Sequence, residues 1–183
     1  IPTMRSMILE FTDDHTCEDL DRQYLLGDSL LVAPIFREDS MADYYLPCGT
    51  WTHLLSNDVK EGERWVQEAY DYFSLPLFVR ENTLLPIGGC NQKPDYDYGE
   101  NLTLHLFCLK EGKSASSTVY DLHAHEILSA HASKTQNTVT ISFSGNTRPQ
   151  FLLRNIFHLS KLSGAKLQQD ELGIRLIPEA DVT

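Results

Sequence analysis

Residues 102–107 place a leucine at every second position, and this two-residue period constrains the fold more than any other feature of the chain. Successive side chains of a strand point to opposite sides of a sheet, so the three leucines share one face. Residues 139–143 repeat the period with Val, Ile and Phe, and the apolar runs FLLRNIF and GIRLIP follow. Strands about ten residues apart, with few helical windows, are typical of an antiparallel β-sandwich. We therefore predict a mainly β fold with a sandwich over residues 102–183.

The first 36 residues have a different pattern. The apolar run IPTMRSMILEFT, residues 1–12, predicts one extended and largely buried strand. Helical spacing then appears at about residues 18–26, and Gly27 is a natural helix stop. The continuous apolar run LLVAPIF predicts a strand, and Pro34 inside it favours an edge or a bulge. A helix that ends in a buried strand so near residue 1 suggests the end of a larger structure.

Short strands separated by turns are predicted from there to Gly89. The runs ADYYLP and TWTHLL flank Cys48 and Gly49, which predicts a hairpin turn between them. The run RWVQEAY alternates, and SLPLFVRENTLLPIGG contains two apolar stretches. Residues 88–101, GGCNQKPDYDYGEN, hold glycine, proline, acids and tyrosines without a period, so we predict a linker between two β domains.

The charge of the chain limits its partners. The formal net charge is −11 over 183 residues, and the lysines and arginines form no cluster. Nucleic acid and anionic membrane surfaces repel such a chain, so we expect neither as a partner. No apolar run approaches the roughly 20 residues that span a bilayer, and we recognise no secretory signal. The apolar fraction of 42% is ample for a folded core.

The four cysteines, at positions 17, 48, 90 and 108, are spread along the chain without a C-x-x-C pair. Their spacing fits neither a zinc site nor a dense disulfide framework. We expect reduced thiols that pack as small hydrophobic side chains, which favours a cytoplasmic location.

Two stretches could place carboxylates or imidazoles together. Asp13 and Asp14 are adjacent, but hydrolysis of a glycosidic bond needs two carboxylates that face each other about 5–9 Å apart. A cap for the helix that begins near Cys17 is the favoured role. Residues 123–126, HAHE, could present two imidazoles on one face of a strand, yet no third ligand lies at motif spacing. A surface turn is favoured there.

Residues 95–98, DYDY, could line a carbohydrate groove in which tyrosines stack on sugar rings. A linker held in place by its tyrosines is the favoured alternative. Neither Ser29 nor Ser74 stands in the G-x-S-x-G setting of a nucleophile, and the sequence shows no phosphate-binding glycine loop. The sequence therefore predicts no catalytic residue, no metal ligand and no cofactor-binding residue in this chain.

Four ordered segments carry a resemblance to a known family. They are MRSMILEFTDD, DRQYLLGDSLLVAPIF, YYLPCGTWTHL and SLPLFVRENTLLPIG. In this order and at this spacing they resemble the C-terminal part of glycoside hydrolase family 31. The later run PDYDYGENLTLHLF is similar to the α-xylosidase branch of that family, of the bacterial intracellular type. The resemblance covers nearly the whole chain and is strongest over residues 1–110.

The resemblance implies two consecutive antiparallel β-sandwich domains, preceded by the last strand and helix of a catalytic (β/α)8 barrel. The implied boundaries are 1–27 for the end of the barrel, 28–89 for the proximal sandwich, 90–101 for the linker and 102–183 for the distal sandwich. The family mechanism is retaining: one aspartate attacks the anomeric carbon, and a second protonates the leaving oxygen and then activates water. Both aspartates belong to earlier barrel strands, so the resemblance implies that this chain alone is inactive. Arg5 and Glu10 are expected to brace the barrel.

We expect this piece to support the barrel and its assembly in a cytoplasmic α-xylosidase-type enzyme, whose barrel binds the carbohydrate. Its partners would be the upstream barrel of the same polypeptide and, through oligomer contacts, further copies. The alternative is a carbohydrate-binding module, in which Trp51, Trp65, Tyr70 and Tyr72 form an exposed stacking platform. Exposure of the two tryptophans discriminates between these functions, because tryptophans in apolar strands are usually core residues.

Overall fold

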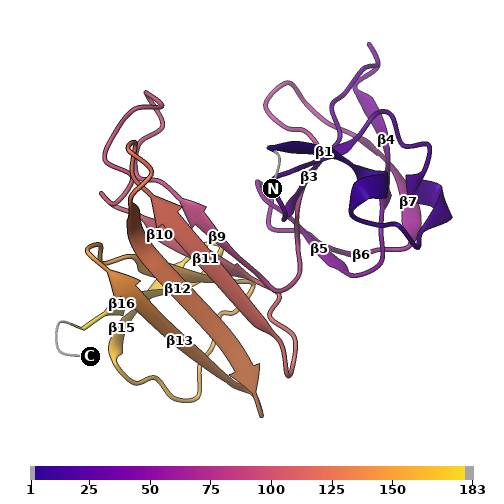
Figure 1. Cartoon of the computed structure of the whole chain (residues 1–183). Coiled ribbons are helices and arrows are strands. Elements are labelled where there is room, and N and C mark those ends of the chain that lie inside the picture. The colour runs from indigo at the N-terminus through magenta and orange to yellow at the C-terminus, as the bar shows by residue number, and fades with distance from the viewer. Residues whose placement is uncertain (1–2, 180–183) are drawn as a thin grey trace. The chain divides into compact units, whose positions relative to one another are not determined.

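The computed structural model describes residues 3–179, and the chain divides into two compact units, Ile1–Glu81 (unit 1) and Asn82–Thr183 (unit 2) (Figure 1). Strands dominate both units. The helical segments of the described residues are two 3-10 turns, Met7–Leu9 (η1) and His15–Cys17 (η2). Within the same residues, no helix is long and apolar enough to cross a membrane. The prediction of a mainly β chain is confirmed.

Unit 1 contains two sheets that are antiparallel throughout. The larger sheet has the order β1 (Met4–Ser6), β2 (Tyr24–Leu26), β3 (Leu30–Val32), β8 (Leu77–Arg80), β5 (Thr50–His53), β6 (Val59–Glu61). In the smaller sheet β4 (Met41–Leu46) pairs with β7 (Arg64–Ala69). The largest fully buried side chains of its core are Met7, Leu25, Leu31, Tyr44, Leu46, Trp51 and Phe78.

The opening segment of unit 1 differs from its prediction. The helix predicted over residues 18–26 is wrong, because Tyr24–Leu26 is a strand that pairs with both β1 and β3. The side chain of Gln23 holds the chain extended at this point. Its Nε2 donates to the carbonyl oxygen of Tyr45 at 2.8 Å, and its Oε1 accepts from the backbone N–H of Tyr45 at 2.8 Å. Gly27, at φ 65°, lies in the turn between β2 and β3 rather than at a helix end.

Two other local predictions also differ from the structure. The strand predicted over residues 1–12 ends at Ser6, where η1 begins. The turn at Cys48 and Gly49 does not close a hairpin, because β4 pairs with β7 whereas β5 pairs with β6 and β8. This turn instead carries the chain from one sheet to the other. All four residues of β5 are buried, which matches a central strand rather than half of an exposed hairpin.

Unit 2 also contains two sheets around one core. The first sheet has the order β15 (Ala165–Asp170), β16 (Gly173–Pro178), β14 (Gln150–Arg154), β10 (Thr103–Phe107), β9 (Thr83–Ile87). The second has the order β11 (Ser114–Tyr120), β12 (Glu126–Thr135), β13 (Thr138–Gly145). Pairing is antiparallel except between β10 and β14, which run parallel, so the all-antiparallel prediction fails for this pair. Leu104, Leu128 and Ile174, from three different strands, are fully buried in the shared core.

Strand β9 places the division between the units earlier than the predicted linker. It pairs with β10 along its whole length, from Ile87 opposite Thr103 to Thr83 opposite Phe107. Residues 90–101 therefore lie in a loop between two paired strands of unit 2, and the division between the units falls at Glu81 and Asn82. The predicted boundary of 28–89 for the proximal domain thus includes a strand that pairs within unit 2.

The second sheet of unit 2 has two chemically different faces. Its inner face contributes Leu128, Ala130 and Ala132 to the core, each at most 2% exposed. Its outer face consists almost entirely of hydroxyl side chains in register across the three strands. The residues of this outer face are Ser114, Ser116 and Thr118 on β11, Ser129, His131, Ser133 and Thr135 on β12, and Thr138, Thr140, Ser142 and Ser144 on β13. We call this set the hydroxyl face.

Candidate functional site

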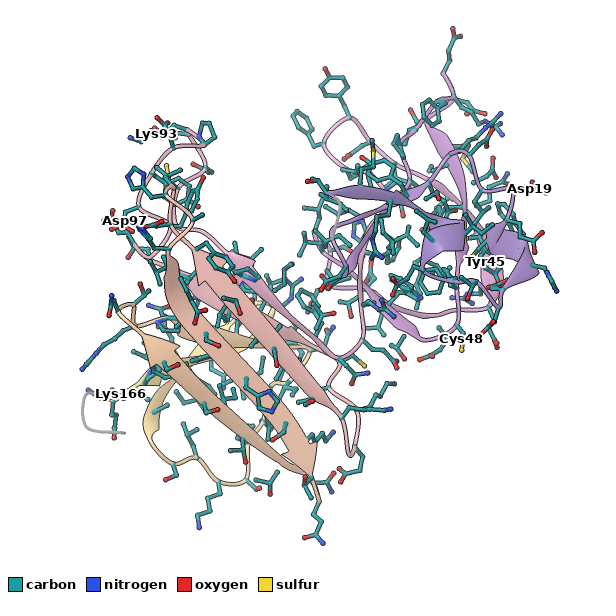
Figure 2. The ribbon with its side chains drawn as sticks, viewed as in Figure 1. Asp19, Tyr45, Cys48, Lys93, Asp97 and Lys166 are labelled. Carbon is teal, nitrogen blue, oxygen red and sulfur yellow. The ribbon has the colours of Figure 1, made fainter. Side chains whose placement is uncertain are left out.

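An acidic pocket of about 590 Å³ lies on unit 1. The carboxylates of Glu10, Asp13, Asp14 and Glu63 line it, together with neutral side chains that include Tyr45. Figure 2 labels Tyr45 and Cys48, which both belong to the wall of this pocket. The structure thus brings the Asp13–Asp14 pair together with two acids that the sequence analysis had not joined to it. This makes the pocket the first place to look for carboxylate chemistry.

Asp14 has a structural role in this pocket. Its Oδ1 accepts from the backbone N–H of Thr16 at 3.0 Å and caps η2, so the predicted capping role holds for a 3-10 turn. Behind the cap, burial raises the pKa of the Cys17 thiol to about 11, with a smaller contribution from the charge of Asp14. A thiol with such a pKa is protonated at neutral pH and is a poor nucleophile.

The structure has all four cysteines as free thiols. The expectation that they pack as small hydrophobic side chains holds fully for Cys17, which is buried. Cys90 and Cys108 are half-buried, and Cys48 is exposed.

Glu10 is held between two arginines from different parts of unit 1. Its Oε2 accepts from Nη1 of Arg5 at 2.7 Å, and its Oε1 accepts from Nη1 of Arg80 at 2.6 Å. Arg5 also donates through Nε and Nη2 to the carbonyl oxygen of Gly27, at 3.2 and 3.0 Å. The Arg80 guanidinium lies 5.7 Å from the ring centroid of Phe11. We call Arg5, Glu10 and Arg80 the Glu10 clamp.

The clamp fixes the charge state of Glu10. The hydrogen bond from Arg80 and, against some desolvation, the one from Arg5 hold the pKa of Glu10 below its ordinary value of 4.5. A general acid for glycoside hydrolysis needs the opposite shift, because it must carry a proton near neutral pH. Glu10 is therefore suited to join η1 to β8 and unsuited to donate a proton.

A second polar cluster gathers around Glu68 beside a pocket of about 440 Å³. Oε2 of Glu68 accepts from the hydroxyls of Tyr44 at 2.9 Å and Tyr70 at 3.0 Å, and Lys60 Nζ donates to Oε1. Desolvation by burial pushes the pKa of Glu68 upward, but the hydrogen bonds from Lys60 and the tyrosines outweigh it and lower the pKa overall. Burial raises the pKa of Tyr70 to about 12. The cluster therefore holds an ionised carboxylate among neutral phenols and is suited to stabilise the contact of β4, β6 and β7.

The serine and histidine candidates also have structural partners. Ser74 Oγ donates to Oδ1 of Asp71 at 2.7 Å. In the HAHE stretch, Oδ1 of Asp121 accepts from the backbone N–H groups of His123 and His125, both at 2.8 Å, which makes the favoured surface turn. Among residues 3–179, no group of three or more His, Cys, Asp or Glu side chains is placed to hold a metal ion.

The DYDY stretch is held by its tyrosines within unit 2. The rings of Tyr96 and Tyr98 meet edge to face, with centroids 4.9 Å apart and planes at 81°. The hydroxyl of Tyr98 donates to the carbonyl oxygen of Pro94 at 2.9 Å, and its ring packs against the core of unit 2. Figure 2 shows Lys93 and Asp97 on the same loop. Two perpendicular, half-buried rings offer no flat face to a sugar.

The four aromatic residues of the proposed platform are dispersed. Trp51 is 1% exposed and its Nε1 donates to the carbonyl oxygen of Pro47 at 2.8 Å, so it is a core residue. Trp65 is 59% exposed and packs against Tyr45, with ring centroids 5.7 Å apart. Tyr70 is bound into the Glu68 cluster, and Tyr72 is 96% exposed. Burial of Trp51 agrees with the supporting role, whereas exposure of Trp65 agrees with the carbohydrate-binding alternative.

One partly buried cluster was missed by sequence reasoning. His105 on β10 accepts through Nδ1 from Nη1 of Arg154 on β14 at 3.2 Å. Burial, followed by the positive charges of Arg154 and Arg175, lowers the pKa of His105 to about 4. The only local signal was the alternation that placed His105 opposite the leucines. The arginines join it because β10 and β14 pair in parallel, which local periodicity does not predict.

Two protein-family models match the chain in tandem. Residues 1–85 match the glycosyl hydrolase family 31 C-terminal domain, and residues 97–183 match the C-terminal domain of alpha-xylosidase YicI. The chain is 35% identical to alpha-xylosidase XylQ of Lactiplantibacillus pentosus over 149 residues, which is 80% of this chain and 19% of XylQ. It is 33% identical to an alpha-xylosidase of Emericella nidulans over 102 residues, 51% of this chain and 13% of that protein.

A solved structure shares the fold. The cycloalternan-forming enzyme of Listeria monocytogenes, in complex with a pentasaccharide substrate, superposes on 97% of this chain with a TM-score of 0.78 and 21% sequence identity. The chain covers 19% of that enzyme. The chain thus spans about a fifth or less of the length of each of these relatives.

Proposed function

This chain belongs to glycosyl hydrolase family 31, and on that premise we propose that it is the C-terminal part of an α-xylosidase-type glycoside hydrolase. The observation that carries the proposal is the order of the two family matches. A C-terminal domain of the family covers residues 1–85, and the C-terminal domain of an alpha-xylosidase follows over residues 97–183. The strand-rich fold of both units supports the same assignment.

In the proposed whole protein, a catalytic barrel outside this chain hydrolyses terminal α-xylosidic bonds by the retaining mechanism. One aspartate of that barrel forms the covalent glycosyl intermediate, and another acts first as acid and then as base. Three carboxylates of this chain make structural contacts instead. Glu10 is bound by two arginines, Asp14 caps η2, and Glu68 accepts from two tyrosines and a lysine.

We propose that unit 1 supports the barrel through an apolar surface on its opening segment. Four apolar side chains are exposed there, and we call them the opening patch: Met4, Ile8, Leu9 and Leu26. Met4 and Leu26 are opposite each other across β1 and β2, and Leu9 is 66% exposed. Apolar side chains gathered on one surface mark a site of contact with another protein surface. Within the same segment, the Glu10 clamp joins η1 to β8.

The proposed location is the cytoplasm, which agrees with four free cysteines. The proposed partners are the barrel of the same polypeptide and further copies of the protein.

The test of the proposed function is an activity assay in two arms. The pure 183-residue chain is expected to release no p-nitrophenol from p-nitrophenyl α-xyloside. The natural polypeptide that contains this chain, purified and sized by intact mass, is expected to hydrolyse the same substrate. Turnover by the pure chain that disappears on mutation of an aspartate within it, such as Asp13→Asn, would show that the chemistry lies here.

The exposure of Trp65 keeps carbohydrate binding as a second candidate function. A single exposed indole beside Tyr45 can stack on a sugar ring. Titration of the chain with an α-xyloside-bearing oligosaccharide tests it, with Trp65→Ala as the variant and Tyr72→Ala, at an even more exposed aromatic residue, as the control. Binding that disappears only in Trp65→Ala would favour this candidate over the supporting role.

A further inference from the structure

The second sheet of unit 2 ends in a long, regular strand. β13 pairs with β12 along all eight of its residues, from Thr138 opposite Thr135 to Gly145 opposite Leu128, without a register shift. On its other side no strand of residues 3–179 pairs with it. Figure 1 shows β11, β12 and β13 side by side with β13 last in the order. Its free side therefore presents a row of backbone N–H and C=O groups that can pair with another strand.

The other edge strands of the described chain each carry a feature that discourages such pairing. β1 and β6 have only three residues each. The remaining protective features are Pro86 on β9, Lys166 and Asp170 on β15, a register shift between Val119 and Tyr120 on β11, Asp43 on β4, and Arg64 and Glu68 on β7. The sequence of β13, TVTISFSG, has no proline, no charged residue and no irregularity. An unprotected edge of this length is thus a special feature of β13.

The charge distribution selects the partner. The chain has a net charge of −11, so two copies repel each other over most of their surfaces. The hydroxyl face beside β13 carries no aspartate, glutamate, lysine or arginine. Two copies can therefore approach at this edge without bringing like charges together. A glycan is a poorer match for this face, because its only Phe, Tyr or Trp ring on the three strands is Tyr120, at the end of β11, and Phe143 lies on the inner side.

We propose that β13 pairs antiparallel with β13 of a second copy of this chain about a twofold axis. The two three-stranded sheets then form one continuous six-stranded sheet, with a hydroxyl face running across the seam. Such a pair makes about eight interstrand hydrogen bonds, one for each residue of the strand. Ile141 and Phe143, half-buried at the edge of the core, meet their symmetry mates across the seam and become more covered. The same patch serves both copies, as an isologous dimer requires.

Sedimentation velocity of the full chain, from about 1 µM to 1 mM, tests the proposal. The wild-type chain is expected to shift from monomer to dimer within this range. The double variant Thr140→Lys, Ser142→Lys places four positive charges at the seam of the dimer, and we expect its dissociation constant to rise at least tenfold. The variant also reduces the net charge in magnitude, so weaker association cannot be ascribed to stronger overall repulsion.

The matched control is Ser114→Lys, Thr118→Lys on β11. It adds the same charges to the same face, about 10 Å further from the seam, and we expect the dimer to persist. Circular dichroism melting checks that both variants stay folded, since all four positions are exposed. A wild-type chain that stays monomeric up to the highest concentration overturns the proposal. So does a dimer weakened equally by both variants, or one that is abolished instead by Leu9→Lys in the opening patch.

Discussion

The Glu10 clamp offers a sharp test, because it joins two segments that are 70 residues apart in the sequence. The variant Glu10→Gln keeps the shape of the side chain but removes its charge, and it turns one acceptor into a donor that faces an arginine. Charge-assisted hydrogen bonds contribute about 1.5–3 kcal/mol each when buried, and exposed ion pairs contribute about 0.2–1 kcal/mol. The Glu10 side chain is 25% exposed, and those of Arg5 and Arg80 are 11% and 35% exposed. We therefore expect about 1 kcal/mol from each bond and a loss of roughly 2 kcal/mol for unit 1.

Tryptophan fluorescence during urea unfolding measures this loss selectively, because both tryptophans of the chain, Trp51 and Trp65, lie in unit 1. With an m-value of about 1 kcal/mol per molar urea for a unit of this size, the midpoint should fall by about 2 M. The control Glu38→Gln removes the same charge at an exposed position and should leave the midpoint nearly unchanged. Equal midpoints for the two variants would refute the role of the clamp.

The pH dependence of the same experiment gives a second check. The pKa of Glu10 is lowered in the folded state, so below its ordinary value of 4.5 the unfolded chain binds more protons than the folded chain. The stabilisation by Glu10 is then fully present above about pH 4.5 and is lost as the pH falls through the lower folded-state pKa. The difference in stability between the wild type and Glu10→Gln should accordingly shrink below pH 4.5. A difference that grows in acid would contradict the assigned charge state.

Two further predictions concern unit 2. In the folded chain the pKa of His105 is lowered from 6.5 to about 4. Between these pH values the unfolded chain therefore binds one proton more than the folded chain, so the stability of unit 2 should rise as the pH increases from about 4 to 6.5. Chemical unfolding followed by circular dichroism at several pH values measures this slope, and His105→Gln should flatten it; an equal slope in the variant would show that His105 is not its source. Gly173→Ala should cost unit 2 about 3 kcal/mol or more, because a Cβ there would lie 2.0 Å from the carbonyl oxygen of Leu153 at φ 149°. The control Gly112→Ala, at φ 68° with open space around it, should cost only about 1–2 kcal/mol in the same measurement. Similar losses in the two variants would show that the close approach of Gly173 to the carbonyl oxygen of Leu153 is unimportant.

The sequence predicted those elements in which local pattern and tertiary contacts agree. The alternation at residues 102–107 and 139–143 corresponds to β10 and β13, because both strands have one face in the core of unit 2. The helix predicted at residues 18–26 failed because Gln23 bonds to the backbone of Tyr45, a contact across 22 residues that no local window contains. Of the candidate site residues, Asp14 kept its predicted capping role, since a cap depends on neighbours two residues away.

The clusters around Glu10, Glu68 and His105 lay beyond the reach of the sequence for a related reason. Each joins side chains from strands that become neighbours only through the sheet order, such as His105 and Arg154 on the parallel pair of β10 and β14. A single charged residue in a strand gives no sign of which partner the fold will bring to it. The family resemblance supplied the overall assignment without the details of these contacts.

The position of β14 between β10 and β16 has a consequence for synthesis on the ribosome. The meander of β11, β12 and β13 needs only neighbouring residues and can form as soon as residue 145 has emerged. Its apolar face, with Leu128 and Ala132, shares a core with Leu104 of β10, which is already made, and with Leu153 and Ile174, which are not. Part of this face therefore stays uncovered until β14 and β16 have been synthesised and have paired with β10 and with each other. During this interval the nascent chain exposes that part of the apolar face. Unit 2 is therefore expected to be the part of the chain that recruits chaperones during translation, and a ribosome stalled near residue 150 is where that recruitment should be strongest.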